Sequence, residues 1–343
     1  MKLSILIKKI NNRWLRIRTI PIFLRFWRLN KKVFGGSSRD KKNSPIVLME
    51  FNGMHSAHIA YAYFANIYSE IHGAQIKAYR PSMLSGARSF FGYWGYQLFA
   101  WGDFGTYRSF GVNEFILPKL KRPQLKRVKN LFSRVISNLK TLTDVEEIEV
   151  NGVCIGDLIY DTFLKRYNQP TIDLENENFR EVLFESLQLF VFWEGYFHAH
   201  KVIGINVSHC VYNFAIPLRL ALKLNIPAFQ VNLTSCYRLS EQRTHAYKEF
   251  IDFPKVFSTI PSSVKDAGKK TAQRRLQARF DGQVGVDMWY SSQSAYGAAR
   301  HEVLIEKSDN KKILVATHCF FDSPHCYGNN LFPDFYSWLQ FLG

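Results

Sequence analysis

Cysteine is scarce in this sequence, and the few cysteines form no recognisable framework. The five of them are odd in number, widely spaced and preceded by no secretory signal. They are Cys154, Cys210, Cys236, Cys319 and Cys326. A set of disulfides of the kind that holds small secreted domains together is therefore not expected, and a reducing cytosol is the natural compartment.

Two common phosphate-binding devices are also missing. The sequence has no Walker-type loop ending in Gly-Lys-Ser/Thr, and no Gly-x-Gly-x-x-Gly follows the first predicted strand. The turn after that strand contains Asn52, Gly53 and His55. An anion could still bind there, at the backbone amides of the next helix.

The first 42 residues lack the run of about 20 apolar residues that a membrane-spanning helix needs. They also lack the small-residue cleavage site of a signal peptide. They hold 13 of the 45 lysines and arginines and a single acid, so most of the net charge of +17 lies at this end. Trp, Phe, Ile and Leu fill the positions between the charges. The pattern favours two cationic amphipathic helices, broken at Pro21, on an anionic membrane surface.

Two alternatives for this basic segment stay open. The same helices could pack on the protein's own domain and expose a solvated basic face. Nucleic-acid binding is the weaker alternative, because no recognisable reader motif follows the charges. We therefore expect no nucleic-acid partner.

The remainder alternates short apolar runs with helical patterns. Strands are predicted at residues 45–51, 75–79, 201–207, 228–231 and 311–317, and helices at 56–71, 123–142, 179–200, 215–224, 263–279 and 332–342. Two strand–helix–strand units among them predict an α/β fold with a doubly wound, Rossmann-like domain. We expect a basic segment and linker at 1–43, this domain at 44–305, and the beginning of a second Rossmann-like domain at 306–343.

Ligands of doubly wound sheets bind beyond the carboxyl ends of the strands, so the loops there are the candidate sites. These loops contribute the predicted substrate-binding residues Asn52, Gly53, Ser208, Asn213, Asn232, His318, Asp322 and His325. Their polar groups suit sugar hydroxyls or phosphate. His209 and His55 are candidate catalytic bases or phosphate contacts. A structural hydrogen bond remains the alternative for any single histidine.

A pair of acids, Asp157 and Asp161, follows the turn Asn151-Gly152. If the chain is helical from Gly156, both carboxylates share a face, and Asp157 is a third candidate for acid–base catalysis. In the alternative, Asp157 caps the helix and Asp161 is solvated.

The segment 318–326 contains two His-Cys pairs, which could supply zinc ligands together with His209 and Cys210. The spacing matches no standard zinc finger or knuckle, so we expect a polar binding loop and no metal.

Three segments carry a family resemblance. They are residues 155–164 (IGDLIYDTFL), 207–212 (VSHCVY) and 316–325 (ATHCFFDSPH). From about Pro45 onward the chain resembles bacterial surface-carbohydrate proteins of capsule and O-antigen biosynthesis. The resemblance implies a two-domain glycosyltransferase of the GT-B kind, acting at the inner face of the cytoplasmic membrane. It also implies a nucleotide-sugar donor, a glycan or lipid-linked acceptor, and no further cofactor.

The sequence departs from this family at its C-terminal end. The donor-binding domain should begin near Lys311 and continue well beyond Gly343, and the family's His-Pro donor motif has no counterpart, so no donor-site residue is transferred. We therefore expect a truncated or split chain, with a donor domain supplied by a separate chain if the protein is active. The alternative function is that of a non-enzymatic assembly factor at the membrane surface.

Zinc is predicted to be absent from the purified protein. Elemental analysis of protein prepared without a metal-affinity tag should find far less than one zinc ion per chain. A stoichiometric zinc signal that disappears when Cys319 and Cys326 are changed to Ser would contradict this expectation.

Overall fold

The computed structural model describes residues 21–22, 24–34, 44–51, 55–83, 103–112, 114–208, 210–232, 235–246, 253–285, 293–294, 296, 309–312, 315, 319–326 and 331–342. For residues 55–58 and 103–105 it describes the backbone alone. The described chain forms two units by its internal contacts, residues 1–248 with 319–343, and residues 249–318.

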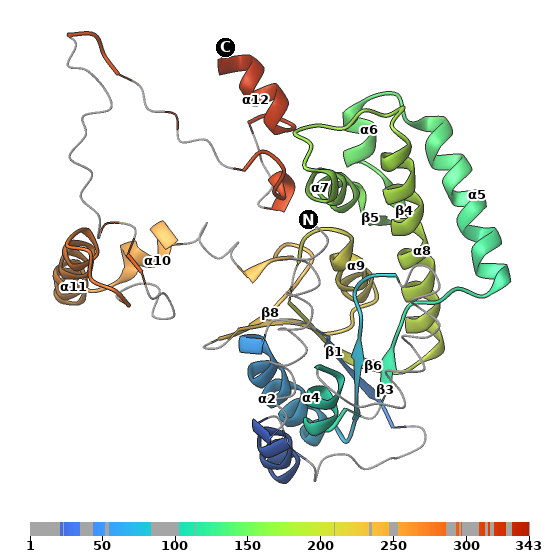
Figure 1. Cartoon of the computed structure of the whole chain (residues 1–343), viewed down its shortest axis with the longest axis horizontal. Helices are drawn as coiled ribbons and strands as arrows, with labels where there is room; N and C mark the ends of the chain where they lie inside the picture. The colour runs from blue at the N-terminus through green and yellow to red at the C-terminus, as the bar shows by residue number, and fades with distance from the viewer. Residues whose placement is uncertain are drawn as a thin grey trace, which may run out of the picture. The chain divides into compact units, whose positions relative to one another are not determined.

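The first unit is built on a six-stranded sheet with the order β3-β2-β1-β6-β7-β8 (Figure 1). Its strands are β1 (Ile46–Glu50), β2 (Gln75–Tyr79), β3 (Glu114–Ile116), β6 (Val202–Val207), β7 (Ala228–Val231) and β8 (Cys236–Arg238). All neighbours are parallel except β7 and β8. The chain moves outward from β1 to β3 and then returns to the other side of β1 at β6. The predicted doubly wound α/β fold is thus confirmed, with its switch point between β1 and β6.

Helices cover both faces of this sheet, which explains why β1 is apolar without alternation. Val47 and Met49 pack with α2 (His55–His72) and with Tyr107 of α4 (Asp103–Ser109). Leu48 packs on the opposite face with α8 (Glu177–Ala199) and α9 (Ile216–Lys223). The predicted strands that end at residues 51, 79, 207 and 231 all appear within one residue of their expected bounds.

The region between β3 and α8 forms a corner that positions the site. Helix α5 (Arg122–Asn138) packs on α8, and the short helix α6 (Leu142–Glu146) follows it, so the single helix predicted at 123–142 is divided. An antiparallel pair, β4 (Glu149–Val150) and β5 (Val153–Cys154), then leads into α7 (Gly156–Tyr167). Asn151 and Gly152 make the turn of this pair with positive φ angles of 52° and 77°, as the Asn-Gly sequence favours.

Part of the basic N-terminal segment packs on the protein itself. Residues 24–34 are helical and bury Phe34 against Ala62 and Phe110, and the Asn30 side chain donates a hydrogen bond to Ser109 Oγ at 3.1 Å. One face of this helix therefore packs on the protein's own domain, which is one of the two alternatives that the sequence left open for the basic segment. The first of the two predicted helices lies outside the described residues. No described helix is both long and apolar enough to cross a bilayer.

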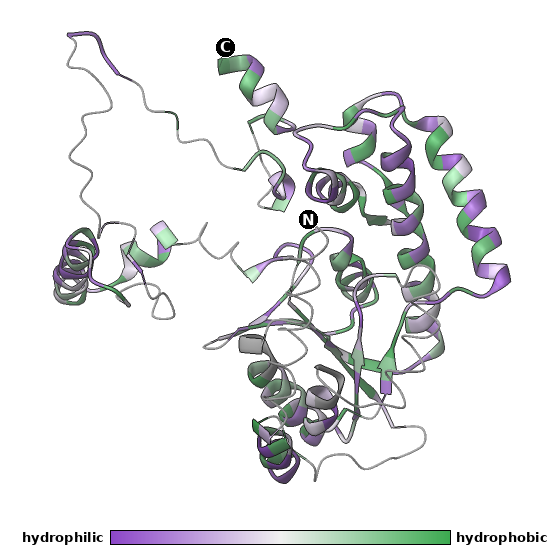
Figure 2. Cartoon of the chain, in the orientation of Figure 1, coloured by the Kyte–Doolittle hydropathy of each residue, from purple (hydrophilic) through white to green (hydrophobic). Residues whose placement is uncertain are grey.

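The second unit contains α10 (Phe253–Thr259) and α11 (Ser262–Phe280), neither of which has a buried residue. The largely hydrophilic α11 was predicted as a polar, basic helix, and it appears within one residue of its expected bounds (Figure 2). Of the strand predicted at 311–317, the described residues 311, 312 and 315 lie outside any strand. The 3-10 turn η3 (Pro324–Cys326) and helix α12 (Phe335–Leu342) belong to the first unit. The predicted domains 1–43, 44–305 and 306–343 stay predictions.

Gly156 allows α7 to begin directly against the end of α6. A Cβ atom at this position would lie 2.1 Å from the carbonyl oxygen of Val145 and 2.3 Å from that of Glu146. Because both obstacles are backbone atoms, they cannot move aside cheaply.

We predict that Gly156→Ala lowers the free energy of unfolding by about 2–3 kcal/mol or more, as overpacking of a rigid site does. Urea unfolding would measure it. Gly268→Ala is the control, because Gly268 in α11 has no atom within 4 Å of the added Cβ. That change should be neutral or stabilise by up to about 1 kcal/mol. Equal stability of the two variants would contradict the close approach at Gly156.

Candidate functional site

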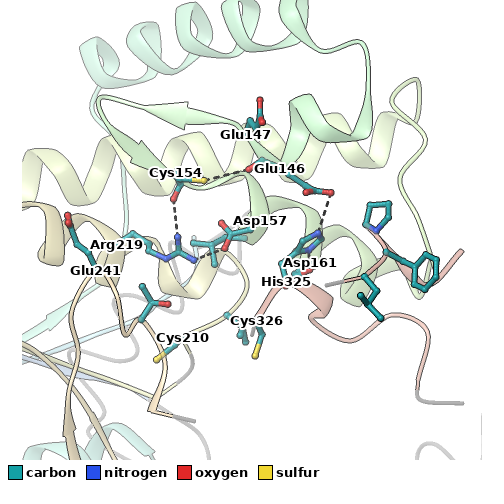
Figure 3. Close-up of a pocket in the computed structure, with 16 residues that line it drawn as sticks. Glu146, Glu147, Cys154, Asp157, Asp161, Cys210, Arg219, Glu241, His325 and Cys326 are labelled. Carbon is teal, nitrogen blue, oxygen red and sulfur yellow. Dashed lines mark hydrogen bonds and ion pairs between the residues drawn. The ribbon is translucent and has the colours of Figure 1, made fainter. Parts of the chain in front are cut away.

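A cavity of about 670 Å³ lies in the first unit, among α6, β5, α7, α9 and the segments that follow β6 and β8 (Figure 3). Residues 325–326 and 331–333 also line it. Its charged lining consists of Glu146, Glu147, Asp157, Asp161, Arg219, Glu241 and His325. It therefore gathers the α7 acids predicted from sequence, one of the predicted loop histidines, and cations and acids from elsewhere in the chain.

Helix α7 places the two acids on one face, as their four-residue spacing predicts. Asp157 lies in its first turn and Asp161 one turn later. The Asp161 side chain is only 3% exposed, so the alternative of a solvated Asp161 is wrong. Asp157 is 23% exposed and forms an ion pair with Arg219 of α9, Oδ2 to Nη2, at 2.6 Å. The two carboxylates thus have different partners and different environments.

Asp161 holds His325 through a hydrogen bond of 2.6 Å between Oδ1 and Nδ1. The other ring nitrogen, Nε2, lies 3.6 Å from Glu146 Oε1, which is an ion-pair distance but too long for a hydrogen bond. The Tyr160 ring packs against the imidazole, with 4.8 Å between the ring centroids. One nitrogen of His325 is therefore fixed by a buried carboxylate, while the other is available at the cavity.

The surroundings make His325 more basic. Burial lowers the pKa of its imidazole, but the hydrogen bond that Nδ1–H donates to Asp161 and the charges of Asp161, Glu146 and Asp157 outweigh burial, so the pKa is raised. Burial also raises the pKa of the Asp161 carboxyl, against the opposing effect of His325. Together the two groups hold a proton at the cavity more tightly than either would in water.

Within the described part of the chain, several buried polar atoms at the cavity have no protein hydrogen-bond partner. They are Glu146 Oε1, Asp157 Oδ1, Arg219 Nε and His325 Nε2. Buried polar groups are nearly always paired in folded proteins, so a concentration of such atoms at a cavity suits bound water or a polar ligand. Carboxylates accept hydrogen bonds from hydroxyl groups, which suits a molecule rich in hydroxyls.

The charge of the lining restricts that ligand further. Five carboxylates face the cavity against one arginine and one histidine. A phosphate group would be repelled by this set, whereas a neutral polyhydroxyl compound or a cation would not. The electrostatics of the cavity therefore suit a neutral polyhydroxyl compound or a cation better than a phosphate group.

The structure connects the three segments that carry the family resemblance. Residues 155–164 contact residues 319–326 through Asp161 and His325. They also contact Asn213, the residue directly after the segment 207–212, whose backbone amide donates a hydrogen bond of 2.7 Å to Thr162 Oγ1. Asp322 completes the set, because it accepts a hydrogen bond from the Tyr212 hydroxyl and lies 3.3 Å from Lys165 Nζ.

The other predicted site residues have mixed outcomes. Asn213 is fully buried, and its carboxamide has no hydrogen-bond partner among the residues that the structure describes. Asn232 stabilises its own turn, since Oδ1 accepts from the Ser235 amide at 2.8 Å. Ser208 donates hydrogen bonds from its backbone amide and its hydroxyl to the buried carboxylate of Glu50. Asn52, Gly53, His209 and His318 lie outside the described residues, as does the side chain of His55, the first residue of α2. Their predicted roles stay predictions.

Glu50 is a functional candidate that the sequence did not single out. It ends β1 at the switch point, is 3% exposed, and accepts hydrogen bonds from the backbone amide and the hydroxyl of Ser208, the residue directly after β6. The signal was a lone acid at the end of an otherwise apolar strand. The sequence analysis did not single out Arg219 either. Its signal was similar, because it is the only charged residue among the first seven of the otherwise apolar helix α9.

Within the described residues, no group of three or more histidines, cysteines, aspartates or glutamates could hold a metal ion. Cys319 and Cys326 are described and take part in no disulfide. Burial raises the pKa of the Cys210 thiol, and the charge of Glu50 raises it further. This thiol therefore stays protonated and is a poor nucleophile or metal ligand.

No protein-family model, curated protein or solved structure matches this chain.

We predict that the Asp161 contact keeps the pKa of His325 above the ordinary value of 6.5. In an NMR titration of the histidine Cε1 protons, the His325 resonance, assigned by its loss in His325→Gln, should titrate above 6.5. Asp161→Asn should lower that midpoint, while Asp266→Asn on the exposed face of α11 should not change it.

The same shift has a defined effect on stability. Because the folded-state pKa is raised, the contribution of His325 to stability is fully present below pH 6.5 and is lost as the pH rises through the folded pKa. The free energy of unfolding should fall less over this interval in Asp161→Asn than in the parent protein. An unchanged His325 midpoint in that variant would show that Asp161 does not control the imidazole.

Proposed function

We propose that this protein is a glycosyltransferase-like component of bacterial surface-polysaccharide biosynthesis, of the capsule or O-antigen type and the GT-B kind. In this proposal the cavity binds the sugar acceptor. The observation that carries it is the meeting of the three resemblance segments around Asp161 and His325, with buried polar atoms left unpaired at the same place.

The proposed chemistry begins at His325. Nε2 takes the proton of an acceptor hydroxyl, and the resulting oxygen nucleophile forms a bond to the anomeric carbon of the donor sugar. The bond from that carbon to the donor's phosphate oxygen breaks, and the nucleotide leaves with the electron pair. Asp161 fixes the tautomer and orientation of the ring and stabilises the imidazolium that forms.

The acidic residues suit the acceptor side of such a reaction. Glu146 Oε1 and Asp157 Oδ1 are free to accept hydrogen bonds from sugar hydroxyls. Arg219 holds Asp157 in place and offers Nε as a donor. The excess of carboxylates argues against donor phosphates in this cavity, so a nucleotide-sugar would bind elsewhere. Glycosyl transfer at the inner face of the cytoplasmic membrane, onto a glycan or lipid-linked acceptor, belongs to the same proposal.

The experiment is a transfer assay with a panel of nucleotide-sugars and a lipid-linked glycan fraction as acceptor, run in a bacterial membrane extract that can supply a separate donor-domain chain, followed by mass spectrometry of the products. His325→Gln should reduce transfer by about 10²–10⁴-fold, the usual effect of removing a general base. Asp161→Asn should also reduce it. His198→Gln is the matched control, because His198 is an exposed histidine on α8, and it should transfer at the parent rate.

Two outcomes would contradict the proposal. Parent-level transfer by His325→Gln would show that this histidine is not the base. No transfer with any donor, combined with saturable binding of the glycan, would favour the non-enzymatic assembly factor.

A further inference from the structure

Helix α2 carries an apolar stripe on its outer face. Ile59, Tyr63, Ile67 and Ile71 are spaced four residues apart and are 45%, 52%, 56% and 71% exposed. At 100° per residue the four side chains lie within a third of the helix circumference. With a rise of 1.5 Å per residue, the stripe is about 18 Å long.

This face is unusual for a helix on a doubly wound sheet. The inner face of α2 already packs on the sheet through Tyr61 and Ala65, and the outer face of such a helix is normally charged. Over its 18 residues α2 has no lysine or arginine and one acid, Glu70. Apolar side chains in a contiguous exposed row mark a surface that binds something.

The helical residues 24–34 lie beside this stripe and supply charge (Figure 1). The Phe34 ring packs edge-on against Tyr63 with 5.2 Å between centroids, so the two helices meet at a member of the stripe. Leu29 and Val33 extend the apolar surface, at 59% and 56% exposed. The exposed cations of the helical residues 24–34 are Arg25, Arg28, Lys31 and Lys32, and residues 21–34 contain no acid.

We propose that α2 and residues 24–34 together form a docking surface for an anionic lipid bilayer. The stripe enters the boundary between headgroups and acyl chains, and the four cations contact lipid phosphates. Trp27, with Lys31 Nζ 4.8 Å from its ring, has the amphipathic character typical of this boundary.

Charge selects a bilayer over a second copy of the chain. Two copies that met through this surface would bring four cations of one close to four of the other, with Glu70 as the only acid on either helix. Like charges at an interface are strongly unfavourable, whereas anionic headgroups neutralise all of them. The inference is independent of the proposed transfer chemistry, because none of these residues lines the cavity.

The test is co-sedimentation of the full chain with phosphatidylcholine vesicles, with and without phosphatidylglycerol. The parent protein should bind the anionic vesicles, and less so at high salt through screening. Ile67→Gln with Ile71→Gln keeps good helix formers at exposed positions and should weaken binding about tenfold or more. Arg28→Gln with Lys32→Gln should weaken it by roughly thirtyfold at low salt, from the contribution of two cations near the surface.

The control is Val264→Gln with Leu276→Gln on α11. These residues are 56% and 52% exposed on another basic helix, but the positions between them at the four-residue spacing are Gly268 and Ala272, so no row of large apolar side chains joins them. This double variant should bind anionic vesicles as tightly as the parent protein does. Circular dichroism should show the same helix content in all variants.

Three results would overturn the proposal. The α2 variant could bind anionic vesicles as tightly as the parent. The α11 control could lose as much binding as the α2 variant, which would make the effect unspecific. Sedimentation velocity could show a dimer of the parent that the α2 variant loses, which would assign the stripe to a second copy.

Discussion

The contact between Asp161 and His325 joins residues 164 positions apart and holds the C-terminal part of the first unit against α7. It does not act alone. At the preceding residue of α7, the Tyr160 hydroxyl donates to Asp334 Oδ2 at 2.8 Å, and Asp334 accepts from the Ser337 amide in the first turn of α12. These contacts hold residues 319–326 and 331–342 against a helix whose own position depends on the close approach at Gly156.

Four of the six strands of the sheet and most helices could be predicted from the sequence because their signals are local, whereas the three-residue strands β3 and β8 were not predicted. The four consecutive apolar residues of β1, Ile46 to Met49, and the helical spacing that gives α8 can be recognised without knowledge of distant residues. The site is different, since each of its contacts pairs segments that no local pattern connects. Nothing in the surroundings of Arg219 indicates Asp157 as its partner, and nothing near Asn213 indicates that it is buried beside Thr162.

For the basic N-terminal segment, too, the local sequence pattern predicted the helix but not the surface that the helix contacts. Its charges and apolar positions correctly indicate an amphipathic helix at residues 24–34. The pattern cannot tell a lipid surface from a protein surface, because both receive an apolar face. In the structure, one face of this helix packs on the protein, where Phe34 and Asn30 are buried. Leu29 and Val33 on the rest of its surface remain exposed.

The order of the residues along the chain also affects how this molecule is made. All six strands of the sheet, β1 to β8, precede His325 in the sequence. A chain that folds as it leaves the ribosome can therefore complete its sheet while the carboxylate of Asp161 still has no imidazole beside it. Until residues 319–326 are added, that carboxylate faces water or takes up a proton. The cavity is in this sense the last part of the first unit to be assembled, and synthesis arrested after β8 would yield a folded sheet without a site.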